Sequence, residues 1–142
     1  MAILLKSARE AASPEDGARV LVERRRPSGV ARDSLLLRNW YPALGPGDDL
    51  RRWFAQRPTQ WPIFRHRYLL ELLDQKATDA LGELHSLVED EGTVTLLATT
   101  KNPERSHAAI LRDLLEGVRK PPATSGPDRA VRGVRIRAQR AR

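Results

Sequence analysis

Three short apolar runs, each rich in Leu, Ile or Val, constrain the fold of this chain more than any other feature. They span residues 2–6, 18–24 and 93–100. Runs without a regular polar alternation are typical of strands buried on both faces of a parallel sheet. Between the second and third runs, apolar residues recur at helical spacing, and another segment with this spacing follows the third run. This order predicts an α/β fold, with a small, mostly parallel sheet flanked by helices in Rossmann-like layering.

The helical segments are marked by residues typical of helix starts, in addition to the spacing of their apolar residues. Asp48 and Asp49 stand in the first turn of one segment, where negative charge complements the helix dipole. Thr59 is the expected N-cap of the next segment, with Pro62 early in its first turn. Helices are expected at residues 45–58, 59–75, 76–92 and 102–118, and a helix or helical turn at residues 31–42.

Several classes of site are excluded or disfavoured by composition and motifs. The chain contains no cysteine, so disulfides, thiolate catalysis and zinc–thiolate sites are excluded. Its three histidines lack metal-ligand spacing, and no phosphate-binding or dinucleotide-binding glycine motif occurs. We therefore expect no metal and no cofactor. No apolar run approaches the roughly 20 residues of a membrane span, so we expect a cytoplasmic bacterial protein without membrane contact.

The positive charge of the chain is concentrated at its C-terminal end. The formal net charge is +7, but eight of the 25 basic residues and only one of the 18 acidic residues fall within residues 119–142. Residues 1–118, with 17 residues of each sign, are expected to form one neutral domain. The Pro-, Gly- and Arg-rich tail, residues 119–142, is expected to be disordered in isolation, although residues 131–138 alternate as an added edge strand would. Its candidate contacts to nucleic acid are Arg129, Arg132, Arg135, Arg137 and Arg140.

Three segments match a known bacterial family in sequence and in order. They read SPEDGARVLVERRRPSG, DLRRWFAQRPTQWPIFRHRYLLEL and TVTLLATTKNPERSHAAIL. Over residues 13–118 the chain thereby resembles the YeaO-like branch of the domain-of-unknown-function 488 family. The resemblance implies an α/β fold and no particular reaction, because the family has no agreed biochemistry.

The chain departs from that family pattern where function is expected. A family Asp is Glu23 here, a family Tyr is Ala98, and a family Asp is Asn102. A family His-Asn pair becomes Arg105 and Ser106, although a histidine follows directly. These departures imply that any family activity is altered or lost in this chain.

A candidate site lies where the second and third apolar runs end. In open α/β sheets, ligands bind beyond the carboxyl ends of the strands, and the two exit loops meet if these runs are parallel neighbours. Free N–H groups at the start of the last helix would favour an anion there. We expect Glu23 and His107 to transfer protons at this edge. The residues expected to bind an anionic ligand are Arg24, Arg26, Lys101 and Asn102.

Structural roles compete with these assignments. Glu23 would order its loop if it paired with Arg24 or Lys101, or with Arg67 turned inward. The arginine run after Glu23 equally suits a solvated surface, and His107 continues an apolar helix stripe as a core residue would. The aromatic residues between positions 53 and 68 have helical spacing, which favours core packing over stacking on bases.

Two functions from different classes follow. The first is a small domain that binds, or acts on, an anionic small molecule at the strand ends. The second is a non-catalytic module whose tail binds nucleic acid weakly, without sequence preference and with strong salt dependence. The sequence does not decide whether the chain is an enzyme, nor its oligomeric state.

Overall fold

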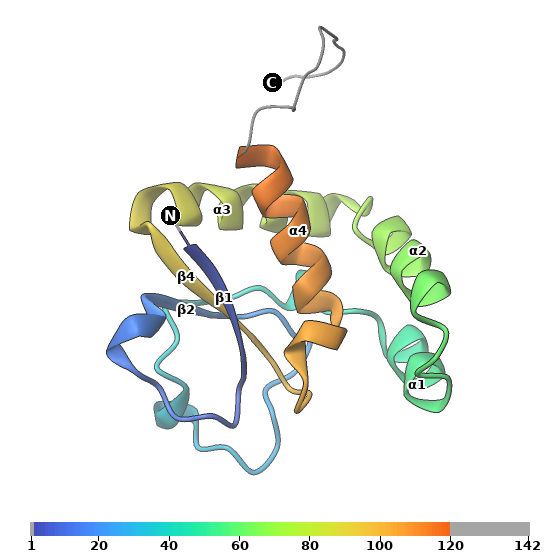
Figure 1. Ribbon diagram of the computed structural model, residues 1–142, viewed down its shortest axis with the longest axis horizontal. Helices are drawn as coiled ribbons and strands as arrows, with labels where there is room; N and C mark the ends of the chain where they lie inside the picture. Colours follow the sequence, from blue (N-terminus) through green and yellow to red (C-terminus); the bar gives the residue numbers. More distant parts are fainter. Residues whose placement is uncertain (1, 120–142) are drawn as a thin grey trace, which may run out of the picture.

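A four-stranded, fully parallel sheet forms the centre of the fold in the computed structural model, which describes residues 2–119 (Figure 1). The strands are β1 (Ala2–Ser7), β2 (Ala18–Leu21), β3 (Asn39–Trp40) and β4 (Thr93–Ala98). Their order across the sheet is β1-β4-β2-β3, so β4 pairs with both β1 and β2. The carboxyl ends of β2 and β4 therefore meet at one edge of the sheet, as the candidate site requires.

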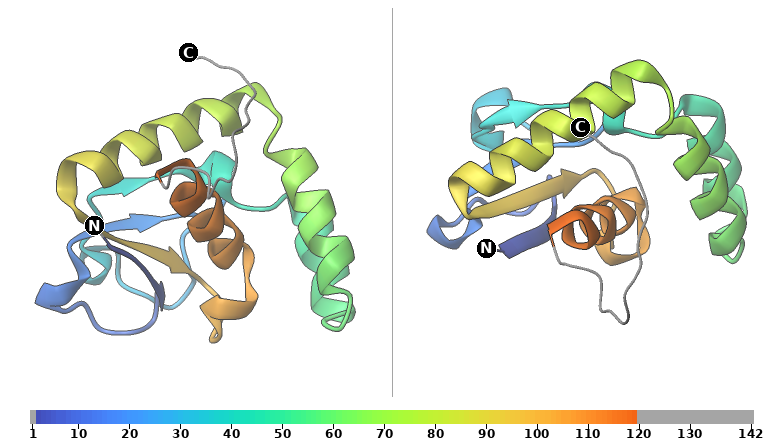
Figure 2. Two further views of the ribbon diagram at one scale, coloured as in Figure 1. Left: turned by 45° about the horizontal axis from the view of Figure 1, so that its top comes forward. Right: turned by 90° about the horizontal axis from the view of Figure 1, so that it is seen from above.

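Within residues 2–119, four α-helices complete the α/β fold, which confirms the predicted class. They are α1 (Asp48–Gln56), α2 (Trp61–Glu71), α3 (Gln75–Glu91) and α4 (His107–Arg119). The views in Figure 2 place α1 and α2 as a pair to one side of the sheet, whereas α3 and α4 lie over it. Side chains of α3 and α4 share the larger core cluster with Val94 and Leu96 of β4. The neighbouring position Leu97 belongs to a smaller cluster with Leu21 and Leu35, because successive strand residues point to opposite faces.

Residues 31–42 differ from the expected helix or helical turn ending at Pro42. The helical turn is confined to Arg32–Leu35, and a second 3-10 turn occupies Pro42–Leu44. Leu36 has a φ of 49°, the left-handed conformation, which stops the first turn. The chain then runs extended as β3, which pairs with β2 and is an outer strand of the sheet.

Smaller differences affect the ends of three other elements. The strand expected at residues 18–24 ends at Leu21, and the N-cap of α2 is Gln60 rather than Thr59. The last helix begins at His107, after a 3-10 turn at Pro103–Arg105. Within the described part of the chain, no helix combines the length and apolar character that membrane crossing demands. Arg119, the first residue of the predicted tail, ends the last helix, and residues 120–142 with the five candidate arginines lie outside the described residues.

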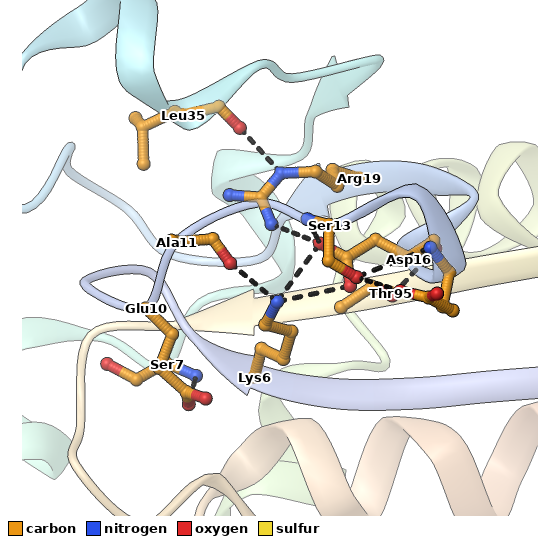
Figure 3. A network of polar contacts seen from close by, with 10 residues as sticks. Lys6, Ser7, Glu10, Ala11, Ser13, Asp16, Arg19, Leu35 and Thr95 are labelled. Atoms are coloured by element: carbon orange, nitrogen blue, oxygen red, sulfur yellow. Dashed lines mark hydrogen bonds and ion pairs between the residues drawn. The ribbon is translucent and has the colours of Figure 1, made fainter.

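A buried ionic network attaches the connection between β1 and β2 to the sheet (Figure 3). Asp16 accepts hydrogen bonds from Lys6 at 3.1 Å and from Arg19 at 2.6 Å. The hydroxyl of Thr95 donates to the carbonyl oxygen of Asp16 at 2.7 Å. Burial by itself would raise the pKa of Asp16, but the hydrogen bonds from the Ser13 amide, Arg19 and Lys6 outweigh it and lower the pKa. The spacing of residues in the sequence did not predict this network.

Candidate functional site

A cavity of about 510 Å³ opens at the sheet edge where β2 and β4 end. Its volume lies within the range of small-molecule binding pockets. Phe54 of α1 and Phe64 of α2 line it, and their rings stack with centroids 4.2 Å apart. The remaining lining comes mainly from residue 23, from α1 and from the connection between β4 and α4. The predicted edge of the sheet therefore carries a cavity, and α1 and α2 supply part of its wall.

Glu23 is a buried acid in the lining of this cavity, with only 3% of its surface exposed. Its Oε2 accepts hydrogen bonds from the amide of Thr99 at 2.9 Å and from the Thr99 hydroxyl at 3.1 Å. Its Oε1 is buried and has no hydrogen-bond partner among the described residues. Buried polar atoms are nearly always paired, so an unpaired carboxylate oxygen beside a cavity requires a specific reason.

His107 is the second buried polar residue of the lining. Its Nε2 lies 2.6 Å from the carbonyl oxygen of Val22 and 4.0 Å from Oε2 of Glu23. A carbonyl oxygen only accepts, so Nε2 carries the proton and donates it to Val22. Burial lowers the pKa of His107 below its usual value, although the nearby Glu23 acts in the opposite direction. The ring is therefore neutral near pH 7 and supplies no positive charge to Glu23.

The aromatic residues continue from the cavity wall into the core, as their spacing predicted. Tyr68 is fully buried, and its hydroxyl donates to the carbonyl oxygen of Leu44 at 2.6 Å. Its ring stacks in parallel with Phe64 and meets the ring of His107 edge-on at 5.5 Å. Burial, with a smaller contribution from Glu23, raises the pKa of Tyr68 well above its ordinary value. Tyr68 therefore remains a neutral hydrogen-bond donor that fixes the segment before α1.

The structure brings three of the sequence-predicted site residues together, namely Glu23, Asn102 and His107, which all line the cavity. It does not bring the predicted cations there. Arg24 is exposed and its Nε donates to the carbonyl oxygen of Gly45 at 3.0 Å. The guanidinium of Arg26 lies over the ring of Trp40, 5.5 Å from its centroid.

Lys101, the last of the predicted cations, is exposed and is not part of the cavity lining. The expected ion pairs of Glu23 with Arg24, Lys101 or Arg67 are also absent among residues 2–119. Arg67 instead lies over the ring of Trp53, 4.5 Å from its centroid. The structural role of Glu23 thus takes another form, because its carboxylate holds Thr99 and so ties the exit of β4 to the exit of β2.

Two other arginines line the cavity, and sequence reasoning assigned neither to the site. Arg51 of α1 and Arg105, just before α4, both line the cavity and are exposed. Neither forms an ion pair within the described part of the chain. A third arginine, Arg52, also lines the cavity, but its charge is paired with Asp49 at 2.6 Å. The sequence held no direct signal for Arg51, because the position of α1 relative to the sheet depends on long-range packing.

The start of α4 does not present the free N–H groups that we expected to bind an anion. The amide of Ala108 donates to the hydroxyl oxygen of Ser106 at 3.1 Å, and the amide of Ala109 donates to the Ser106 carbonyl at 3.0 Å. These contacts satisfy amide groups of the first turn within the chain. No group of three or more His, Asp or Glu side chains in residues 2–119 is placed to hold a metal ion.

Comparison with known proteins identifies the family. The model of a family described as the inactive DUF488-N3 subclade matches residues 2–126. The chain belongs to this DUF488 subclade. The YeaO-like resemblance of its motifs is thereby confirmed.

Two bacterial relatives of this DUF488 chain are described as uncharacterized proteins. It is 38% identical to the uncharacterized protein Rv3073c of Mycobacterium tuberculosis over 104 residues, which are 73% of this chain and 85% of the relative. It is 30% identical to the uncharacterized protein YeaO of Escherichia coli over 118 residues, which are 83% of this chain and the full length of YeaO. No solved structure is significantly similar to the chain.

Proposed function

We propose that this DUF488 chain binds a small anionic molecule in the cavity beyond β2 and β4, and that it does not convert the molecule. The observation that carries the proposal is a 510 Å³ cavity lined by two arginines, Arg51 and Arg105, that form no ion pair within residues 2–119. Asn102 adds an amide to the same lining. Arginine offers a planar set of donors that matches carboxylate and phosphate groups, so an acid group is the natural partner for this rim.

Binding without turnover is favoured over the proton transfer first expected for Glu23 and His107. The Nε2 proton of His107 is held by the carbonyl oxygen of Val22. Oε2 of Glu23 is held by two donors of Thr99. Both groups are thus engaged in structural bonds, and the description of the matching subclade as inactive agrees with a binding role.

Titration of the full-length, ¹⁵N-labelled chain with ethyl phosphate tests this proposal by NMR. We expect saturable chemical-shift changes at the backbone amides of Thr99, Asn102 and Arg105. Arg105→Ala should weaken the affinity by at least about 10-fold, because a charge-assisted hydrogen bond typically contributes about 1.5–3 kcal/mol. Arg38→Ala is the matched control, since Arg38 is exposed and pairs with Glu91 near the amino end of β4, at the opposite edge of the sheet.

The same titration separates the proposal from binding by the tail. Shift changes confined to residues 120–142, and abolished by moderate salt, would favour the tail as the anion-binding element. Equal affinities of the Arg105→Ala and Arg38→Ala chains would also contradict binding in the cavity. A titration with a short DNA duplex, read from the same amides, assigns any nucleic-acid contact to one part of the chain.

A further inference from the structure

We infer that the ligand of this cavity is a small zwitterion, whose ammonium group pairs with the buried carboxylate of Glu23 while its acid group faces Arg51 and Arg105. This inference rests on the proposed function and adds the chemical class of the ligand. It starts from the unpaired oxygen of Glu23, whereas the proposed function was argued from Arg51 and Arg105.

The unpaired oxygen of Glu23 calls for a donor. The side chain of Glu23 is 5% exposed, its Oε2 is saturated by Thr99, and its Oε1 has no partner among the described residues. A buried carboxylate without a compensating charge is costly, so buried acids are paired or hydrogen-bonded. Oε1 itself is closed to a water-sized molecule. Because Glu23 lines the cavity, a cationic group in the cavity can still supply the missing counter-charge to the carboxylate at short range.

No protein cation neutralises Glu23 in the described part of the chain. His107, 4.0 Å from Oε2, has a pKa lowered by burial and donates its Nε2 proton to Val22. Arg24, the adjacent residue, turns to the carbonyl oxygen of Gly45. An ammonium group therefore fits this carboxylate better than a neutral hydroxyl, since it brings the opposite charge as well as the hydrogen bond.

The cavity orders the two charges of the ligand. Its acid, Glu23, is buried, whereas its two unpaired cations, Arg51 and Arg105, are exposed. The stacked rings of Phe54 and Phe64 add an apolar surface to the same lining. The matching molecule has an ammonium group at the buried end of the cavity, a short apolar link, and a phosphate, carboxylate or sulfonate group at the rim.

A matched pair of probes tests this assignment by calorimetry on the full-length chain. 2-Aminoethyl phosphate and ethyl phosphate share the acid group and the two-carbon link, and differ in the ammonium group. We expect the amino compound to bind at least about 10-fold more tightly, as a hydrogen bond between charged groups would give. Glu23→Gln should reduce this preference to less than about 2-fold.

The outcomes distinguish this inference from the proposed function. Equal binding of the two probes by the unmodified chain would overturn the zwitterion and leave the anionic ligand in place. A preference that survives in Glu23→Gln would also overturn it, because the ammonium group would then lie elsewhere. Binding of neither probe at millimolar concentration would refute both ideas. The comparison of probes on the unmodified chain needs no variant, so a folding defect of Glu23→Gln cannot obscure it.

Discussion

Replacing Asp16 with Asn tests whether the buried ionic network stabilises the fold to the extent that its geometry indicates. The side chains of Asp16 and Arg19 are each 4% exposed, and their charged atoms lie 2.6 Å apart. Asp16→Asn preserves the shape of the side chain but leaves Arg19 buried without its closest counter-charge. Removal of one partner of a buried ion pair typically costs about 3–5 kcal/mol. Lys6 is more exposed, at 19%, so its charge is solvated and adds less to this cost.

Urea unfolding at pH 7, followed by tryptophan fluorescence, measures this free energy. A loss of about 3–5 kcal/mol is a large share of the roughly 5–15 kcal/mol that stabilises a typical domain. Asp49→Asn is the matched control, because Asp49 is fully exposed and pairs with Arg52 on the surface, so no measurable change in unfolding free energy is expected. A loss of less than about 1 kcal/mol in Asp16→Asn would refute the reasoning.

The pH dependence provides a second readout of the same network. The pKa of Asp16 is lower in the folded chain than in the unfolded chain, so the folded state favours the ionised form. This contribution is fully present above the unfolded pKa, about 3.9, and is lost as the pH falls through the folded pKa. The unmodified chain should therefore lose more unfolding free energy on acidification than Asp16→Asn. Equal acid dependence of the two chains would contradict the assignment.

Three further changes test other parts of the structure. Tyr68→Phe leaves the Leu44 carbonyl oxygen without its donor and should lower the free energy of unfolding by about 1–3 kcal/mol in urea; an unchanged value would refute that role. Burial makes the pKa of His107 lower in the folded chain, so the unfolded chain takes up the proton first and stability should fall as the pH drops below about 6.5. In urea unfolding at several pH values, the free energy of unfolding of His107→Gln should not show this decrease. The same decrease in His107→Gln would mean that another group causes it. Gly45→Ala would place a Cβ 2.5 Å from the backbone nitrogen of Arg24, so we expect weaker ethyl phosphate binding by calorimetry, and unchanged binding would show that the backbone after β2 adapts freely.

The sequence was sufficient to predict three of the four strands and the end of the sheet at which the cavity opens. Apolar runs identified β2 and β4, and polar residues next to a strand end remain close to that end whatever the rest of the chain does. For this reason Glu23, two residues after β2, lines the cavity together with Asn102 and His107. The direction of the exposed side chains was not predictable in the same way. Arg24 and Arg26 turn away because the carbonyl oxygen of Gly45 and the ring of Trp40 in β3 attract them.

Two features depended on contacts that sequence spacing does not encode. Arg51 reaches the cavity because α1 and α2 pack beside the sheet edge, an arrangement fixed by tertiary packing of their aromatic residues. The Asp16 network joins three separate segments, although a signal for it existed. Arg19 lies inside an apolar strand, and a buried arginine requires an acid nearby. The preceding acidic turn supplies that acid.

A crystal structure of the full-length chain with 2-aminoethyl phosphate tests the central claim most directly. We expect the ligand in the cavity beyond β2 and β4, with its nitrogen within about 4 Å of a carboxylate oxygen of Glu23. Its phosphate should contact Arg51 or Arg105. A ligand-free cavity at saturating concentration, or a ligand whose nitrogen points away from Glu23, would contradict the claim.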